Sequence, residues 1–372
     1  WLSILRILHI ELGRHRFGGT MQCFYLASSL QKQGHQNMVV TPKGSPLSAL
    51  FHDADADADV SVAAINDRGD VDVSLIPKLM QLIKNFQPDI THIHSRRGAD
   101  TLGLLAARWA NVGKIIVSRR VDDPLPQNFI TKLRYQTLAD HTVAVSQGIV
   151  RALVTAGVEQ DKISQVYSSI KFDDYCKDAD TATVRKELNI KHKQVVAVIG
   201  QLISRKGHRF LIEAAPAILA LHPDTCFLFL GEGEEEERLK SMVAEAGLEQ
   251  HFTFAGYREN VGEILTVIDI LLHPATMEGF ANVAMQALAA AKPVVSSAVG
   301  GMPEIVLDGE TGILVPPQNP AAIVDALDKL LSDSSLRDKL GRKGQQRVKE
   351  KFSVENMVAN TLAVYEKILA EN

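Results

Sequence analysis

Short apolar runs alternate with amphipathic helical patterns along this chain, and the alternation occurs twice. In the first half the runs are Ile4–Ile10, Asn37–Thr41, Asp89–His94, Lys114–Ser118 and His141–Val145. In the second half they are Gln194–Ile199, Cys226–Gly231, Phe252–Gly256, Ile268–His273, Pro293–Ser296 and Gly312–Val315. Helical patterns, such as Thr20–Gln33 and Leu75–Asn85, lie between them. Strands that alternate with helices form parallel sheets covered on both faces. The sequence therefore predicts an α/β protein with two doubly wound domains.

The length of 372 residues also favours two domains, because a single core stops growing at about 250–300 residues. Apolar periodicity is lost between Tyr167 and Asp180, which marks the seam. We therefore predict an N-terminal domain at residues 1–170 and a C-terminal domain at residues 171–352. Residues 353–372 predict a terminal amphipathic helix, with Ser353 as its N-cap, that needs a surface to cover.

The composition is that of an ordinary globular protein, with 46% hydrophobic and 23% charged residues. No apolar run approaches the roughly 18–20 residues of a membrane span. The opening WLSILRILHI carries Arg6 and His9 and is more typical of a buried strand than of a signal peptide. Three widely spaced cysteines (Cys23, Cys176, Cys226) lack the pattern of a disulfide framework or of metal ligands. These features predict a cytoplasmic protein.

Charge is divided unevenly along the chain. Residues 1–170 hold 18 Lys and Arg against 15 Asp and Glu (18 − 15 = +3), whereas residues 171–372 hold 22 against 29 (22 − 29 = −7). The weak positive surplus of the first half suits an anionic acceptor or contact with an anionic membrane face. No stripe of basic residues indicates nucleic-acid binding.

Glycines and paired cations follow several predicted strands, at the edge where doubly wound sheets bind ligands. Gly18-Gly19 precede the first helix, where backbone N–H groups can approach a phosphate, although paired glycines at a turn are also commonly structural. Gly200 ends a later strand, and Arg205-Lys206 follow just before a predicted helix. Adjacent cations commonly form a solvated surface pair, but cations beside a helix N-terminus are stabilised by a bound anion. We therefore predict a diphosphate site here.

Two further loops carry candidate binding groups. Gly233 lies in the GEGEEEE turn, and Tyr257 lies in FAGYREN one strand later, where the turn backbone can hold the edge of a base. Glu278 precedes a helix on which Asn282 and Gln286 share one face. The free backbone N–H groups at that helix start can bind phosphate oxygens. They belong to Gly279, Phe280, Ala281, Asn282 and Val283. Glu278 and Asn282 also suit a purely capping role.

These motifs, in this order, resemble the retaining nucleotide-sugar glycosyltransferases of family 4, also described as glycosyl transferases group 1. The resemblance rests on the Gly-Gly loop, the Arg-Lys pair, GEGEE, and HPATMEGFANVAMQALAAAKPVVSSAVGGMPEIVLDGETGILVPP. It covers essentially the whole chain and is strongest from about Gly200 to Pro317. It implies the GT-B fold, in which two Rossmann-like domains face each other across a cleft and the terminal helix crosses back to the N-terminal domain.

The resemblance also implies roles for individual residues. Arg205 and Lys206 would bind the donor diphosphate, together with the N–H groups after Gly279. Glu278 would contact the transferred sugar, so that these three side chains form the catalytic set, and Gly19 would lie opposite them across the cleft.

Gln286 departs from the family, which has a glutamate here that grips the ribose hydroxyls. A glutamine oxygen also accepts from a hydroxyl, through a bond worth about 0.5–1.5 kcal/mol rather than the about 1.5–3 kcal/mol of a charged acceptor. We interpret Gln286 as a variant ribose contact. The alternative is a catalytically weak or inactive paralogue.

A second departure follows the fourth predicted strand, where many family members place a histidine. This chain has SRRVDDPLP, and Arg119 and Arg120 suit an anionic acceptor, such as a phosphorylated or carboxylated glycan or a lipid phosphate. As the alternative, one arginine pairs with Asp122 or Asp123. Two further acceptor-side candidates are His94 and Arg96.

The repeat HDADADADV contains the Asp-x-Asp spacing with which another glycosyltransferase fold holds a divalent metal. There the carboxylates follow an apolar strand, whereas here they alternate with alanine in a predicted surface loop after the second strand. We predict that the protein needs neither a metal nor a cofactor.

The resemblance thus predicts an enzyme that moves a sugar from a nucleotide-sugar to a glycan or lipid-linked acceptor, with retention, in bacterial envelope or lipopolysaccharide biosynthesis. The mechanism it implies is front-face and metal-independent, with peripheral contact between the N-terminal domain and the inner membrane face. A sugar-nucleotide epimerase or phosphorylase of the same architecture is an alternative, but no catalytic acid or cofactor lysine stands out for it. A two-domain solute-binding protein is the non-enzyme alternative, and it would lack the Arg-Lys and Glu278 combination.

Overall fold

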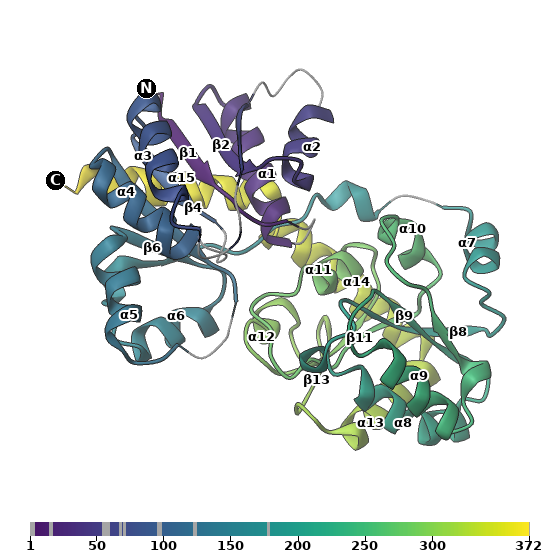
Figure 1. Cartoon of the computed structure of the whole chain (residues 1–372). Coiled ribbons are helices and arrows are strands. Elements are labelled where there is room, and N and C mark those ends of the chain that lie inside the picture. The colour runs from purple at the N-terminus through teal and green to yellow at the C-terminus, as the bar shows by residue number, and fades with distance from the viewer. Residues whose placement is uncertain are drawn as a thin grey trace. The chain divides into compact units, whose positions relative to one another are not determined.

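A computed structural model describes residues 4–14, 18–53, 60–66, 69, 72–94, 99–121, 125–176 and 179–371 of the chain (Figure 1). The chain forms two compact units. Unit 1 comprises Trp1–Ser169 together with Val354–Asn372, and unit 2 comprises Ile170–Ser353. Each seam lies one residue from the boundary placed on the sequence.

Unit 1 is built on a seven-stranded parallel sheet. Its strands are β1 (Arg6–Ile10), β2 (Gln36–Pro42), β3 (Ser61–Ile65), β4 (Ile90–Ile93), β5 (Lys114–Arg119), β6 (His141–Ala144) and β7 (Ile163–Gln165). They lie in the order β3-β2-β1-β4-β5-β6-β7, with Leu8 of β1 paired to Met38 on one side and Thr91 on the other. The chain order reverses between β1 and β4, so the loops after these two strands border the crevice in which such sheets bind ligands.

Helices cover both faces of this sheet (Figure 1). They are α1 (Gly18–Lys32), α2 (Pro46–Asp53), α3 (Leu75–Phe86), α4 (Leu104–Ala110), α5 (Phe129–Lys132), α6 (Gln147–Thr155) and α15 (Val354–Ala370), and π-helical turns occupy η1 (Ala99–Gly103) and η2 (Leu133–Leu138). Helix α15 follows unit 2 in the chain but belongs to the core of unit 1. Its Tyr365 and Ile368 are buried in one cluster with Ile7, Leu26 and Ile116.

Unit 2 is built on a six-stranded parallel sheet in the order β10-β9-β8-β11-β12-β13. The strands are β8 (Gln194–Ile199), β9 (Thr225–Leu230), β10 (Phe252–Phe254), β11 (Ile270–His273), β12 (Val294–Ser297) and β13 (Gly312–Val315). The helices are α7 (Thr181–Glu187), α8 (His208–Leu221), α9 (Glu236–Glu245), α10 (Val261–Thr266), α11 (Asn282–Ala289), α12 (Met302–Ile305), α13 (Pro320–Ser332) and α14 (Ser334–Lys351). The chain order reverses between β8 and β11, which are directly paired through Ile270 and Val196.

The expectation of two doubly wound parallel-sheet domains is confirmed, and two strands that the sequence did not reveal are added to unit 1. Strand β3 lies at one edge and β7 at the other, and both are only partly buried. No helix in the described ranges combines the length and the apolar content that a bilayer crossing requires.

Candidate functional site

The loops after β8 and β11 lie against each other at the point where the strand order of unit 2 reverses. The loop after β8 forms a short helical turn, Ser204–Lys206, before α8 begins at His208. Thr276 donates to the Arg205 carbonyl from its backbone N–H (2.8 Å) and its hydroxyl (3.2 Å). Gly207 has φ +72°, and a Cβ there would stand 2.0 Å from the Pro274 carbonyl oxygen. Glycine at this position therefore lets the two loops meet.

This contact brings Lys206 and Glu278 together. The Lys206 ammonium donates to Glu278 Oε2, and the two side chains are only 14% and 12% exposed. His273, at the end of β11, is fully buried beside them, with its Nε2 3.2 Å from the same carboxylate oxygen. That distance places the ring directly against the carboxylate, although the ring is not aligned for a hydrogen bond. A cation, a carboxylate and an imidazole thus share one site.

The protonation of Glu278 follows from these neighbours. Burial by itself raises the pKa of the carboxyl, but the His273 ring and the Lys206 charge outweigh it and hold the Glu278 pKa below its usual value. Burial lowers the pKa of His273, so its ring is neutral at pH 7. Glu278 is therefore an ionised acceptor of hydrogen bonds at pH 7 and not a proton donor.

Arg205 differs from its neighbour Lys206 in environment. Its side chain is exposed, and its Nη1 lies 3.5 Å from the Met277 carbonyl, at the limit of a hydrogen bond. Lys206 is directed inward to Glu278 and Arg205 outward, so the predicted pair divides into one buried and one exposed cation at the same loop.

Helix α11 begins next to this site without a side-chain cap. Its N-cap is Ala281, which has no side-chain acceptor to offer, and no acidic residue lies in the first turn. The first N–H groups of a helix have no intrahelical acceptor. Phe280 and Ala281 are buried and anchor the turn, whereas Asn282 and Val283 are half-buried. The helix start is therefore open to an anion.

Gln286 lies on the half-buried side of α11, one turn beyond Asn282. Its Nε2 donates to the Tyr175 hydroxyl at 2.7 Å, and Tyr175 ends the short turn Phe172–Tyr175 at the start of unit 2. This bond fixes the amide so that Oε1 is the group left to accept from a ligand hydroxyl.

The other predicted donor residues lie further along the same sheet edge. A Cβ at Gly233 would be 2.3 Å from the Leu202 carbonyl oxygen, and one at Gly231 would be 2.0 Å from that of Gly200. These glycines therefore have a packing reason to be present, because they let the loops after β8 and β9 touch. Tyr257 follows β10 and is 52% exposed, and its backbone N–H donates to Glu232 at 3.3 Å.

In unit 1, Gly18 is the first residue of α1, and Arg120 lies beside the next residue. A Cβ on Gly19 would contact the Arg120 side chain at 3.8 Å. Arg120 follows β5 and points toward His94, with its guanidinium 3.4 Å from both the carbonyl and the Nδ1 of that residue. Arg119 is instead buried, and it donates to the Tyr135 hydroxyl at 3.1 Å. The two neighbouring arginines have different roles.

His94 is buried in a polar network. Because Arg120 can only donate, the Nδ1 of His94 accepts, so its Nε2 carries the proton and donates to His9 Nδ1 at 3.0 Å. His9 Nε2 in turn donates to the Asn37 amide oxygen at 3.1 Å. Burial lowers the pKa of His9 to about 4 and that of His94 well below its usual value. Both rings are therefore neutral at pH 7. His94, fixed by its bond to His9, holds the Arg120 guanidinium in position.

Three buried histidines (His9, His92, His94) bring one nitrogen each within 4.8 Å, the arrangement of a metal site. Their ring nitrogens are already used. His92 bonds Tyr365 through Nδ1 at 2.5 Å and Ser118 through Nε2 at 2.8 Å. With the Arg120 charge directly beside them, these residues fit a hydrogen-bonded network and not a cation.

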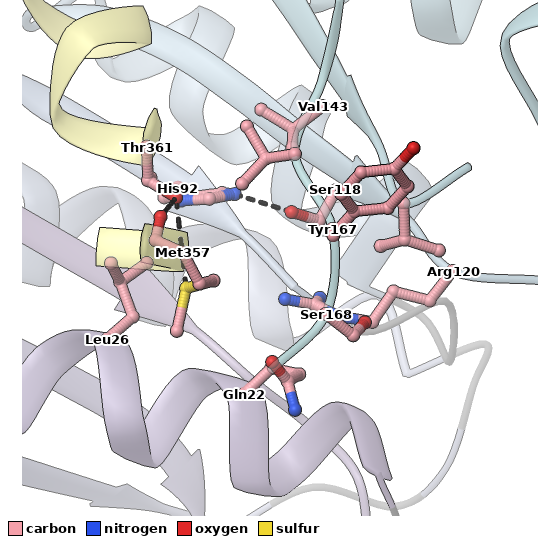
Figure 2. A pocket seen from close by; sticks show the side chains of 12 residues that line it. Gln22, Leu26, His92, Ser118, Arg120, Val143, Tyr167, Ser168, Met357 and Thr361 are labelled. Atoms are coloured by element: carbon pink, nitrogen blue, oxygen red, sulfur yellow. Dashed lines mark hydrogen bonds between the residues drawn. The ribbon is translucent and has the colours of Figure 1, made fainter. Parts of the chain in front are cut away.

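Figure 2 shows a small pocket in unit 1 where this network meets α1 and α15. Arg120, Ser118 and Tyr167 line it from the carboxyl side of the sheet, and Gln22 of α1 lies opposite. Gln22 is not available to a ligand, because its amide exchanges two hydrogen bonds of 2.7 Å with the backbone of Ser169.

Several predicted features lie outside the described residues. They are Arg96, the aspartates Asp122 and Asp123, and most of the Asp-x-Asp repeat. Helix α2 lies between β2 and the repeat, and it ends with His52 and Asp53, the first two residues of HDADADADV.

Three site residues were not predicted. His273 had a recognisable signal, a polar residue at the end of an apolar run. Tyr175 and His9 had none, because their partners Gln286 and His94 lie 111 and 85 positions away.

Two family models match the chain over successive ranges. The model described as Glycosyltransferase Family 4 matches residues 18–173, and the one described as Glycosyl transferases group 1 matches residues 180–347. An N-acetyl-alpha-D-glucosaminyl L-malate synthase of Bacillus anthracis is 24% identical over 93% of this chain and 93% of its own. A D-inositol 3-phosphate glycosyltransferase of Corynebacterium glutamicum is 30% identical over 68% of this chain and 64% of its own. The chain spans about half, 54%, of an uncharacterized glycosyltransferase of Methanocaldococcus jannaschii, at 29% identity.

Solved structures share the fold along the whole chain. A glycosyltransferase from Rickettsia africae superposes with a TM-score of 0.87 at 20% identity and 100% coverage of both chains. Anabaena HepE in complex with UDP-glucose superposes with a TM-score of 0.84 at 19% identity, over 97% of this chain and 100% of its own. The expected GT-B fold is confirmed. With both models matched in order and the fold shared throughout, this chain belongs to the glycosyltransferases described as group 1 and family 4.

Proposed function

We propose that this chain transfers a sugar from a nucleotide-sugar donor to an acceptor hydroxyl, with retention of the anomeric configuration. The observation that carries the proposal is the buried Lys206–Glu278 pair beside the uncapped start of α11. Cations and helix N-terminal N–H groups suit a diphosphate, and a carboxylate is a strong acceptor for sugar hydroxyls. The UDP and UDP-glucose complexes of HepE support a donor of this class.

In this proposal the exposed and the buried cation act together on the leaving group. Arg205 and Lys206 bind the diphosphate from one side, and the N–H groups from Gly279 to Val283 bind it from the other. Glu278, ionised at pH 7, accepts from a sugar hydroxyl. Gln286 accepts from a ribose hydroxyl through the oxygen that the Tyr175 bond leaves available, and Tyr257 offers an exposed ring to the base.

The proposed reaction takes place on one face of the sugar. The bond from the anomeric carbon to the diphosphate oxygen breaks, and the acceptor oxygen forms the new bond on the same face. The acceptor proton passes to the departing phosphate oxygen, so the products are the glycoside and the nucleoside diphosphate. Lys206, Arg205 and the α11 amides stabilise the charge that develops on the leaving group. No step calls for a metal or a cofactor.

For the acceptor we propose an anionic molecule, recognised in unit 1. Arg120 is the described residue that fits, because its guanidinium is held at the end of the His94 network beside the start of α1. Two relatives have names that include L-malate and D-inositol 3-phosphate, both anionic. A third is a lipopolysaccharide core biosynthesis glycosyltransferase of Rhizobium meliloti, which supports an envelope glycan and peripheral contact with the cytoplasmic membrane face.

A donor screen tests the proposal directly. Common nucleotide-sugars are ranked by thermal shift, and release of free nucleoside diphosphate from the best of them is then followed with and without EDTA. We expect a stabilising donor, slow release without acceptor, and no effect of EDTA. If none of the nucleotide-sugars stabilised the protein, the donor assignment would be wrong, and if magnesium restored an EDTA-inhibited rate, the metal-independent mechanism would be wrong.

A further inference from the structure

His273, at the end of β11, has a buried ring nitrogen that is not used in a hydrogen bond. The residue is 2% exposed, and among the described residues its Nε2 has no hydrogen-bond partner. This nitrogen nevertheless lies 3.2 Å from Glu278 Oε2, the oxygen to which the Lys206 ammonium donates. Buried polar atoms without a partner are costly and uncommon in folded proteins. His273 is therefore a second, unused partner of the same carboxylate.

Lys206 cannot serve Glu278 in every state of the site. In the proposed function, on which this step rests, the Lys206 ammonium binds the donor diphosphate. A diphosphate carries more negative charge than one carboxylate and attracts the cation more strongly at the same distance. The lysine stem runs beside Gly200, where a Cβ would contact its Cε at 3.7 Å and its Cδ at 3.8 Å, so glycine leaves the stem room to move. We expect the ammonium to leave Glu278 when the diphosphate binds.

Glu278 then needs another partner, because its carboxylate is only 12% exposed. A buried carboxylate that loses its cation is strongly destabilised. Arg205 is the other cation of the loop, but its side chain is exposed and its Nη1 lies 3.5 Å from the Met277 carbonyl. The His273 Nε2 is already in place, and a small rotation of the ring or of the carboxylate aligns the two groups.

We propose that His273 takes over Glu278 when a diphosphate takes Lys206. The ring, with its proton on Nε2, then donates to Glu278 Oε2 and leaves Oε1 to accept from the sugar hydroxyl. His273 is a positioning residue, because it acts on the donor only through Glu278. The exchange adds to the proposed donor site the residue that keeps the sugar-binding carboxylate in place.

The contact between His273 and Glu278 can be tested without a donor. Lys206→Met removes the cation from Glu278, as the diphosphate is proposed to do. In the Lys206→Met protein, His273→Leu should lower Tm by about 3 °C or more, because Glu278 then has neither partner. In the wild-type protein, His273→Leu should leave Tm unchanged or raise it, because it removes an unpartnered buried nitrogen. Equal changes in Tm in the two proteins would overturn the proposal.

The exchange itself is tested by calorimetric titration with UDP-glucose, or with the nucleotide-sugar that ranks above it in the donor screen. His273→Leu should raise Kd about fivefold or more, whereas His273→Gln, whose amide can also donate, should stay within about twofold of wild type. In a Glu278→Gln protein, His273→Leu should have no further effect, because the enclosed group is then neutral. A loss of the same size in that protein would show that His273 does not act through Glu278.

His208→Leu is the matched control. His208 is also 2% exposed in unit 2, and its ring packs edge-on against Phe229 with the ring centroids 5.0 Å apart. This variant should leave Kd for the same donor within about twofold of wild type. An equal loss of affinity in the His208 and His273 variants would mean that any buried ring near the loop has this effect, and the specific role of His273 would be wrong.

Failure of the donor assignment is read separately. If wild type bound no nucleotide-sugar, the donor assignment would be wrong and the exchange with it, whereas the comparison of Tm values would still show whether His273 pairs with Glu278. If wild type bound the donor but His273→Leu bound it equally well, the donor assignment would stand and the exchange alone would be rejected.

Discussion

Lys206 and Arg205 are adjacent in the chain, yet the fold gives them different surroundings. Lys206 is enclosed with Glu278 and His273, whereas Arg205 is exposed. A cation in a site that excludes water stabilises developing charge more strongly than an exposed one. The buried member of the pair is therefore the one on which the rate should depend most.

Lys206→Ala tests this dependence. We expect kcat for nucleotide release or transfer to fall about 10²-fold or more, because the leaving diphosphate loses its enclosed cation. Lys339→Ala, at an exposed position of α14, is the control and should leave kcat unchanged. A near-normal rate in the Lys206 variant, measured at saturating donor, would remove Lys206 from the leaving-group site.

Gln286 allows a test in which a substitution should strengthen donor binding. Gln286→Glu should bind the donor about two- to tenfold more tightly, because a charged acceptor bonds a ribose hydroxyl more strongly than a neutral one. The Tyr175 hydroxyl can donate to the new carboxylate, so the side chain stays in place. Calorimetric titration with UDP-glucose measures the change, and weaker binding would contradict the ribose contact.

Tyr175→Phe tests the same ribose contact by removing the hydroxyl group that orients the Gln286 amide. The variant frees the Gln286 amide to rotate, and we expect donor affinity to fall about two- to fivefold. An unchanged dissociation constant in the Tyr175 variant would show that the bond of 2.7 Å does not orient Gln286 for the donor.

Arg119 and Arg120 are a matched pair for separating stability from recognition. Arg119→Ala leaves the buried Tyr135 hydroxyl without its donor, so we expect the free energy of unfolding to fall by about 1–3 kcal/mol. Arg120→Ala should chiefly raise the KM for an anionic acceptor. Urea unfolding and acceptor titration of both variants distinguish the roles, and a reversed pattern would exchange them.

At the scale of elements, the strands with continuous apolar runs could be predicted from the sequence, and the edge strands could not. In β9 every residue is buried, and the run Thr225–Leu230 reads as a strand without knowledge of its neighbours. Strand β3 has only one buried residue of five and β7 has none of three. An edge strand has a neighbour on one side and less covering, so its sequence carries less of the apolar signal.

For the site, the residues could be predicted from the sequence, but their contacts with one another could not. Residues that follow strands, such as Lys206 and Glu278, could be identified because parallel strands deliver their loops to one edge. That Glu278 is already paired with Lys206, and that Gln286 is tied to Tyr175, depends on contacts between distant segments and could not be read from local sequence.

Helix α15 is held in unit 1 by one buried polar bond as well as by apolar packing. Tyr365→Phe leaves His92 Nδ1 without its partner at 2.5 Å, and we expect a loss of about 1–3 kcal/mol in the free energy of unfolding. Glu366→Gln, next to it on the exposed side, should have no effect. Equal stability of the two variants in urea would show that packing alone retains the helix.

For the whole molecule, buried neutral histidines predict a loss of stability in acid. The pKa is lowered by burial to about 4 in His9 of unit 1 and to about 3 in His208 of unit 2. Between pH 6.5 and these values the unfolded chain binds protons that the folded chain does not. Stability should therefore fall with decreasing pH by about 1.4 kcal/mol per pH unit for each such group. Glu278, whose pKa is also lowered, adds a loss in the same direction below about pH 4.5.

Thermal unfolding between pH 7.5 and 5 measures this dependence. We expect Tm to fall steadily below pH 6.5, and His208→Leu should make the fall shallower, because it removes one titrating group. A Tm that stayed constant or rose in this range would mean that the histidines are protonated in the folded protein.

Helix α15 also sets the order in which the two units can mature on the ribosome. Residues 170–353 are synthesised before the helix, so all the elements of unit 2 are present first. Unit 1 still lacks Tyr365 and the other core residues of α15 at that stage. While the second half is being synthesised, the core of unit 1 is therefore incomplete. Its residues Ile7, Leu26 and Ile116 lack the packing that α15 provides. The time taken to translate the second half therefore sets how long that apolar surface stays uncovered.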